Sequence, residues 1–193
     1  MDVVRIAQYV GGIGFILWAL VERGFSLLNQ AQGRGRGQDH GSYWLISACW
    51  YGATLFSLLD AWYWRWTTFG RPFWVVRGIG MLGVAGGIAI RILARRALGK
   101  QYSVRVETSD AHRLVTGGMY EVIRHPAYLG LVCLLLGIPL SEGSWGGIVI
   151  AVVGGMPAIV YRIGIEEASL REWFGQAYAQ YQERTWRLIP YLW

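Results

Sequence analysis

Two blocks of polar residues beside apolar segments carry the residue types that could do chemistry. The first block, residues 117–130, contains an arginine, His125 and two tyrosines, and the second begins at Glu166 and Glu167. Arg171 follows Glu167 by four residues, so the two side chains share one face of a helix. Ionisable side chains next to a membrane are costly and mark functional sites. The two blocks therefore indicate an enzyme whose site lies at a membrane face.

His125 is the strongest single candidate for ligand binding. It precedes a proline, which biases its backbone toward an extended conformation and predicts a corner between a loop and a helix. Such a corner points a ring nitrogen into a pocket. Arg124 comes directly before it and Tyr128 three residues later, so we favour ligand binding over a purely structural role.

The composition predicts an integral membrane protein. The 193 residues are 54% hydrophobic and 16% charged, and their mean hydropathy is +0.32, which is too apolar for an ordinary soluble domain. The 11 Trp and 11 Tyr fit the aromatic enrichment of membrane interfaces. Cys49 and Cys133 both lie in apolar runs, so we expect neither a disulfide nor a metal site.

The elements that must position these residues are predicted to be membrane helices. Apolar segments occupy residues 6–28, 43–64, 73–98, 126–140 and 145–163. The expected fold is all-α: a polytopic membrane protein with about five transmembrane helices plus a C-terminal amphipathic helix. Residues 1–193 would form a single membrane domain, with three spans in 1–98 and the cofactor-binding and catalytic half in 99–193.

The fourth apolar segment is short for a span. At 1.5 Å per residue, about fifteen residues scarcely cross a hydrocarbon core of about 30 Å. Its helix is therefore expected either to begin earlier, near Met119, or to be partly covered by protein. Residues 141–144 are predicted to close a helical hairpin, and residues 101–124 to form a loop over the active face.

Several further patterns predict packing and surface features. Glycines spaced four apart at Gly83 and Gly87, and small residues at the same spacing in 147–155, are typical of closely packed membrane helices. The apolar positions of residues 170–181 recur at helical spacing and predict an amphipathic helix on or under the membrane face. Glu22 and Asp60 lie within apolar segments and are candidate functional groups for that reason.

The distribution of basic residues predicts the orientation. With five spans, thirteen Lys and Arg residues fall on one side and four on the other. The richer side is expected to be cytoplasmic, which places the C-terminus there and the N-terminus outside. The net charge of +6 then reflects contact with anionic membrane lipids. Nucleic-acid binding is not expected, because basic and aromatic residues are not interleaved on a soluble module.

The two blocks resemble the isoprenylcysteine carboxyl methyltransferases and the related phospholipid N-methyltransferases. The likeness covers residues 98–190 and is carried by paired motifs in a fixed order. These are Leu114-Val115-Thr116-Gly117-Gly118-Met119-Tyr120, Arg124-His125-Pro126-x-Tyr128-x-Gly130, Glu166-Glu167-x-x-Leu170, Phe174-Gly175-x-x-Tyr178-x-x-Tyr181 and Arg187-Leu188-Ile189-Pro190.

The resemblance implies a membrane methyltransferase without a Rossmann fold that takes its methyl group from S-adenosylmethionine and releases S-adenosylhomocysteine. Glu167 and Arg171 are implied to be catalytic, near the acceptor. The residues implied to hold the cofactor are Val115, Gly117, Tyr120, His125, Tyr128, Leu129, Glu166, Tyr181 and Leu188. No metal is implied. The partner would be a lipophilic substrate, a prenylated cysteine or a lipid, entering from the bilayer.

The nature of the acceptor stays open at this point. A carboxylate is already a nucleophile at neutral pH and needs only alignment and desolvation, and Arg171 could orient it by paired hydrogen bonds. An amine must first lose a proton, which Glu167 could accept. The alternatives are methyl transfer to a phospholipid amine or a small thiol, an NADPH-dependent membrane reductase similar to sterol reductases, and a non-catalytic membrane protein.

Overall fold

The computed structural model describes residues 6, 9, 12–20, 41–70, 73–99 and 114–193. Every regular element in this part of the chain is a helix. After helical residues 12–20 these are α2 (Ser42–Leu59), η1 (Asp60–Trp64), α3 (Trp74–Leu98), η3 (Gly118–Glu121), α4 (Pro126–Glu142), α5 (Trp145–Ile150), η4 (Ala151–Gly155), α6 (Met156–Phe174) and α7 (Gln176–Arg184). The all-α prediction is confirmed for the described residues.

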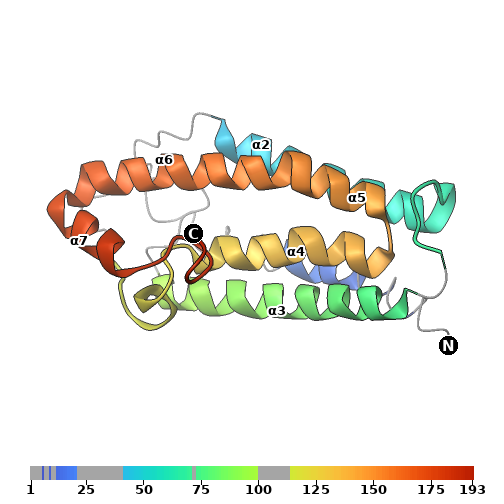
Figure 1. Cartoon of the computed structure of the whole chain (residues 1–193), viewed down its shortest axis with the longest axis horizontal. Coiled ribbons are helices and arrows are strands. Elements are labelled where there is room, and N and C mark those ends of the chain that lie inside the picture. The colour runs from blue at the N-terminus through green and yellow to red at the C-terminus, as the bar shows by residue number, and fades with distance from the viewer. Residues whose placement is uncertain (1–5, 7–8, 10–11, 21–40, 71–72, 100–113) are drawn as a thin grey trace.

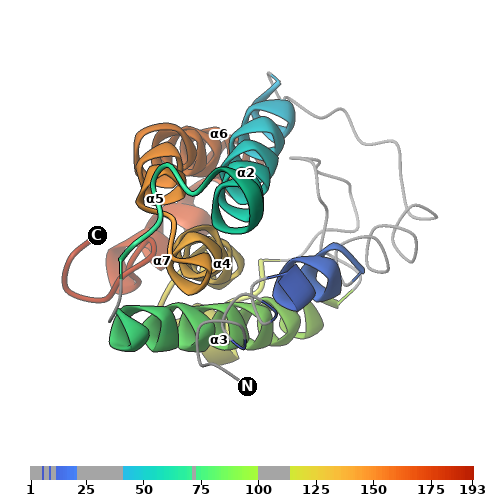
Figure 2. The same ribbon diagram turned by 90° about the vertical axis from the view of Figure 1, so that its right-hand side faces the viewer.

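Helix α4 lies at the centre of the molecule. Figure 2 shows α3 on one side of it and α2 with the α5–α6 helix on the other. The core is accordingly apolar, with Leu134, Leu135 and Ile138 of α4 fully buried. Because α4 is central (Figure 2), protein covers most of the surface of this short apolar helix. Of the two expectations for this segment, coverage by protein is the one that the structure confirms.

The other expectation, a helix beginning near Met119, is wrong. Met119 lies in the separate short helix η3, and α4 begins only at Pro126. The break occurs because Pro126 keeps His125 out of the helical conformation. The backbone of His125 has φ −125° and ψ 56°, which is neither helical nor the extended conformation that the sequence predicted. His125 is thus the predicted loop-to-helix corner.

Glycines let α3 and α4 approach closely, as their spacing predicted. A Cβ atom built on Gly87 would lie 2.8 Å from the carbonyl oxygen of Gly130, and one on Gly137 would lie 3.0 Å from that of Gly80. Both distances are shorter than van der Waals contact allows. The small residues of 147–155 pack in the same way, since Gly155 meets the side chain of Leu135.

A polar cluster at the end of the bundle opposite α7 explains Asp60. Its carboxylate accepts hydrogen bonds from the hydroxyls of Thr67 and Ser144 and from the backbone N–H of Thr67. Ser144 in turn caps α5 by accepting from the N–H of Gly147. Asp60 therefore closes the predicted α4–α5 hairpin, with Gly143 at its turn in the left-handed region at φ 75°. Glu22, the other acidic candidate, lies outside the described residues.

Among the described residues, two helices are long and apolar enough to cross a membrane, namely Trp74–Leu98 and the continuous helix Trp145–Phe174, and Pro126–Glu142 is a shorter apolar helix. The count of about five spans stays a prediction. The α2–η1 helix matches the predicted segment 43–64 within one residue at its start. Most of the first predicted span, the loop 29–41 apart from its last residue, and residues 101–113 lie outside the described part. Figure 1 shows the helices running along one long axis, with α7 at one end.

The prediction of one amphipathic helix through residues 170–181 is wrong in its boundaries. Helix α6 continues the fifth segment as far as Phe174, and Gly175 at φ 54° ends it. A side chain at this φ is strained, so glycine serves as the break. The shorter helix α7 follows, and its buried residues Tyr178 and Tyr181 pack into the protein.

Candidate active site

Backbone hydrogen bonds join the two sequence blocks at one end of the bundle. The N–H of Arg124 donates to the carbonyl of Trp186 at 2.8 Å, and the N–H of Trp186 donates to the carbonyl of Val122 at 2.9 Å. The N–H of His125 donates to the carbonyl of Arg187 at 3.1 Å. The segment before α4 is therefore held against the C-terminal segment, and this pairing fixes where Arg187 lies.

Glu167 lies at the centre of the ion pairs of the site. Its side chain is 3% exposed, and Arg124 Nε donates to its Oε1 at 2.9 Å. Arg187 reaches the other carboxylate oxygen through Nε at 2.9 Å and Nη2 at 2.8 Å. His125 Nε2 lies 3.3 Å from Oε1. A buried carboxylate thus receives a guanidinium and an imidazole from residues 124–125 and a second guanidinium from the C-terminal segment. This arrangement offsets the cost of its burial.

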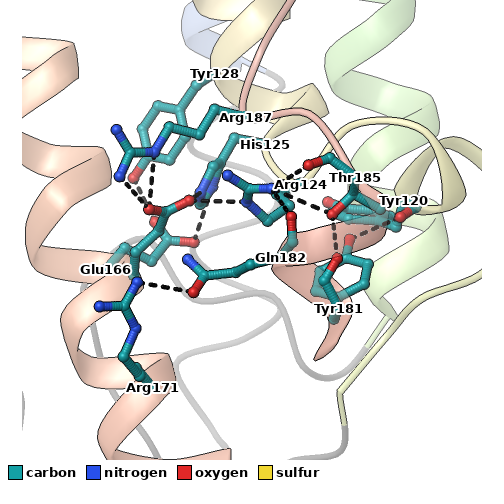
Figure 3. Close-up of polar contacts among 11 residues, drawn as sticks. Tyr120, Arg124, His125, Tyr128, Glu166, Arg171, Tyr181, Gln182, Thr185 and Arg187 are labelled. Carbon is teal, nitrogen blue, oxygen red and sulfur yellow. Dashed lines mark hydrogen bonds and ion pairs between the residues drawn. The ribbon is translucent and has the colours of Figure 1, made fainter. Parts of the chain in front are cut away.

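Glu166, the neighbouring carboxylate, is oriented differently and stays partly accessible. Its side chain is 31% exposed, and His125 Nδ1 lies 3.7 Å from its Oε1. Tyr128 donates its hydroxyl to Glu166 Oε2 at 2.7 Å and accepts from Arg162 Nε at 3.1 Å. Arg162 also donates to the hydroxyl of Ser42 at 2.8 Å. The imidazole of His125 therefore lies between two carboxylates, one buried and one open (Figure 3).

Two tyrosines and Arg124 tie α7 to the loop before α4. Tyr181 donates its hydroxyl to the carbonyl of Tyr120 at 2.7 Å, and burial raises the pKa of Tyr181 to about 12. Arg124 Nη1 donates to the carbonyls of Gln182 and Thr185. Gln182 lies on α7, and Thr185 is the residue directly after this helix. Figure 3 shows these contacts converging on Arg124 from α7.

Tyr178 is the buried polar group of the site that the structure leaves unsatisfied. The residue is 1% exposed, and among the described residues its hydroxyl has no hydrogen-bond partner. Burial and the nearby negative charges of Glu167 and Glu166 raise the pKa of Tyr178, so the phenol stays protonated and available as a donor. An unpaired buried hydroxyl costs about 1–3 kcal/mol, which a bound ligand could recover.

The structure brings most of the predicted site residues together. His125, Tyr128, Glu166 and Glu167 form one hydrogen-bonded group, and Tyr120 and Tyr181 form a second beside it. Residues at the edges contribute packing or lie in the approach to the site. Leu129 packs against the core and Leu188 is part of it, whereas Val115 and Gly117 lie in the partly exposed segment leading into η3.

Arg171 is separate from Glu167, although four residues on a helix link them. Arg171 is exposed and donates through Nη2 to the side-chain oxygen of Gln182 at 2.8 Å, while Glu167 is held by Arg124 and Arg187. The two predicted catalytic side chains therefore have different surroundings. Arg171 lies at the rim of the site, and its catalytic role stays a prediction.

Three arginines of the network were not among the predicted site residues: Arg124, Arg162 and Arg187. Arg124 and Arg187 belong to the quoted motifs, so their position beside His125 and Leu188 was the available signal. Arg162 had a weaker signal, a single positive charge four residues before Glu166 near the end of an apolar segment. Buried charges of this kind are found paired, as Arg162 is with Tyr128 and Ser42.

The fold and the site together define an apolar helical bundle with a network of charged side chains at one end. A profile of the phospholipid methyltransferase family matches residues 75–177, which include α3 to α6 and the start of α7. The chain belongs to the phospholipid methyltransferase family.

Curated relatives carry a more specific name. The chain is 28% identical over 130 residues to a probable protein-S-isoprenylcysteine O-methyltransferase of Oryza sativa subsp. indica, covering 63% of this chain and 65% of the relative. It is 30% identical over 116 residues to the protein-S-isoprenylcysteine O-methyltransferase of Xenopus laevis, covering 59% and 40%. The chain thus spans less than two thirds of the length of these relatives.

A solved structure shares the fold. The eukaryotic intramembrane Ras methyltransferase, isoprenylcysteine carboxyl methyltransferase, superposes with a TM-score of 0.54 at 22% sequence identity, covering 78% of this chain and 52% of that one. This confirms the resemblance on which the expected architecture rested and shows that the two proteins share a fold.

Proposed function

We propose that this protein is an integral membrane methyltransferase that moves a methyl group from S-adenosylmethionine to the carboxylate of a prenylcysteine-like lipophilic substrate. The observation that carries the proposal is the network of ion pairs that joins His125, Glu166 and Glu167 to Arg124 and Arg187 at the end of the helix bundle. Membership of the family supplies the reaction class, and the names of the curated relatives supply the acceptor class.

The residues of the site fit S-adenosylmethionine by charge and by hydrogen bonding. When bound, this molecule supplies an electrophilic methyl group on a positively charged sulfur. Glu166 offers a partly exposed carboxylate for its positive groups, and Tyr178 offers a buried donor without a partner in the part of the chain that the structure describes. Tyr120, His125 and Tyr181 would form the surrounding wall, with Val115, Gly117, Tyr128, Leu129 and Leu188 completing the set.

The environment of Glu167 favours a carboxylate acceptor over an amine. Both oxygens of Glu167 accept hydrogen bonds from arginines, so taking up a proton would weaken two ion pairs at once. An ammonium acceptor requires a base to remove its proton before attack, and Glu167 is poorly suited to that task. A carboxylate needs orientation and loss of water only, and Arg171 at the rim has a charge that can orient it.

In this proposal Glu167 acts by positioning. It holds Arg124 and Arg187 in place and fixes one ring nitrogen of His125, so that the other nitrogen faces Glu166. Arg162 and Tyr128 fix Glu166 from the opposite side. The site is thus assembled before the substrate arrives, which lowers the entropy lost on reaching the reactive arrangement.

The membrane arrangement is part of the proposal. We place five spans in the bilayer, with the C-terminus and the site on the cytoplasmic side, because basic residues concentrate there. The prenyl group would enter from the bilayer, while S-adenosylmethionine would arrive from water. A site at the membrane interface would be open both to the prenyl group from lipid and to S-adenosylmethionine from water.

Methyl transfer to a phospholipid amine is the second candidate, and the family profile is the observation that favours it. The two acceptors can be separated by competition. An S-farnesylcysteine analogue is expected to compete with methyl transfer to any other acceptor, and phosphatidylethanolamine in the same micelles is expected to accept no label.

Cofactor binding tests the proposal before any acceptor is known. Titration of the detergent-purified protein with S-adenosylmethionine and with NADPH should show binding of the first only. Tyr178→Phe removes one hydroxyl and should weaken S-adenosylmethionine binding about tenfold, the equivalent of about 1.4 kcal/mol. Its melting temperature should stay equal or rise, because the unsatisfied buried hydroxyl is gone. Binding of NADPH in place of S-adenosylmethionine would favour a reductase.

A further inference from the structure

The C-terminal turn, residues 186–193, exposes apolar side chains next to the site. Tyr191 is 90% exposed and Leu192 is 76% exposed, and Trp186 and Ile189 are each 40% exposed. Val122, which is bonded to Trp186 through the backbone, adds a fifth exposed apolar side chain. The rings of Trp186 and Tyr191 lie 5.5 Å apart, and exposed apolar side chains gathered in this way mark a contact with a membrane or another molecule.

Backbone hydrogen bonds hold this turn in one conformation, so the fold fixes the positions of its exposed side chains. The carbonyl of Trp193 accepts from the N–H groups of Leu188 and Ile189 at 3.0 and 3.2 Å, and the N–H of Trp193 donates back to the carbonyl of Ile189 at 3.0 Å. Leu188 anchors the turn in the core at 1% exposure. Tyr191 has φ 65°, a region that bulky residues seldom occupy, so the fold holds this side chain outward at a cost.

Charge and direction point to the bilayer as the occupant. Residues 184–193 contain two arginines and no acidic residue, and Arg187 lies over the Trp193 ring at 5.5 Å. Aromatic and basic side chains together are typical of the layer where headgroups meet acyl chains. In Figure 1 the segment turns back from α7 toward the middle of the bundle, along the axis of the candidate spans, and Figure 2 shows its end at the side of the bundle.

We propose that the C-terminal turn is a membrane-docking surface that inserts Tyr191 and Leu192 at the boundary between headgroups and acyl chains in the leaflet next to the site. The exposed face of α7 differs, because Gln180 and Glu183 on it are polar. The water side of this end of the molecule is therefore α7, and the lipid side is the turn. Arg187 connects the docked turn directly to Glu167.

Depth measurements with spin labels test this docking without relying on the enzymatic activity. Cys49 and Cys133 are first replaced by alanine, and Leu192→Cys and Ile189→Cys are each labelled with a nitroxide in nanodiscs of phosphatidylcholine and phosphatidylglycerol. Gln180→Cys and Glu183→Cys are the matched controls on α7. Two label positions are used on each surface so that one poorly folding variant does not decide the outcome.

The expected result is a ratio of oxygen to nickel-chelate accessibility several-fold higher at positions 189 and 192 than at 180 and 183, because oxygen concentrates in lipid and the chelate in water. Equal ratios at all four positions would overturn the proposal, since the turn would then lie in water. Protection from both reagents at 189 and 192 would also overturn it, because protein would then cover the turn.

Discussion

Glu167→Gln removes one negative charge from the centre of the network while keeping the size of the side chain. The carboxylate accepts from Arg124 through one oxygen and from Arg187 through the other. A glutamine can keep only one of these interactions, because its NH2 group would face a guanidinium. Removing one partner of a buried ion pair costs about 3–5 kcal/mol, and we expect about 3 kcal/mol because Arg187 is 38% exposed and partly solvated.

For a chain of this length, a loss of about 3 kcal/mol lowers the melting temperature by about 6–12 °C. Thermal unfolding followed by circular dichroism at 222 nm in detergent measures it directly. Glu172→Gln is the matched control, since Glu172 is exposed on the same helix, and its melting temperature should remain close to that of the wild type. If Glu167→Gln and Glu172→Gln have the same melting temperature, the ion pairs of Glu167 do not stabilise the protein.

Three more substitutions test other parts of the account. Gly87→Ala should destabilise the protein by about 1–3 kcal/mol, because its Cβ would meet the Gly130 carbonyl at 2.8 Å. Gly86→Ala is the control and should not destabilise it, because Gly86 has open space around it. Equal melting temperatures of the two variants would contradict this packing. Tyr181→Phe should cost about 1 kcal/mol at pH 8. Burial raises the pKa of Tyr181 from 10.0 to about 12, so the wild type loses stability as the pH rises between those values, by more than this advantage. The melting temperatures of the two proteins should therefore converge and then cross, and a gap independent of pH would refute the role of Tyr181. Arg171→Ala should raise the KM for the acceptor and leave S-adenosylmethionine affinity unchanged in steady-state assays, whereas loss of cofactor binding would place Arg171 elsewhere in the mechanism.

The helices of the bundle could be predicted from sequence because each depends on local pattern. Apolar runs located α3 and the hairpin between α4 and α5, and the spacing of Gly83 and Gly87 identified the face of α3 that meets α4. These features follow from chain-local rules of length, hydropathy and side-chain size.

The start of α4 and the end of α6 needed more than the apolar pattern. Pro126 marked the first of these boundaries, and Gly175, which follows Phe174, marked the second. Both signals are local, but amphipathic spacing across residues 170–181 obscured the second one. A glycine between two segments of helical periodicity indicates the end of a helix when the residues after it bury a different face from the residues before it.

The partners of Glu167 could not be predicted, because they depend on contacts between distant segments. Spacing along a helix indicated Arg171, whereas the structure places Arg124 and Arg187 on this carboxylate. Arg187 reaches it because the C-terminal segment pairs through its backbone with residues 122–125. No periodic pattern in a sequence reports a pairing of this kind.

The central claim, methyl transfer to a carboxylate, is tested most directly by following labelled methyl groups. Detergent-purified protein is incubated with methyl-labelled S-adenosylmethionine and N-acetyl-S-farnesylcysteine, with His125→Ala in parallel. The account predicts a product whose label is released by base, as a methyl ester requires, and loss of that product in His125→Ala. Label that resists base and appears in phosphatidylethanolamine, or equal transfer by His125→Ala, would contradict it.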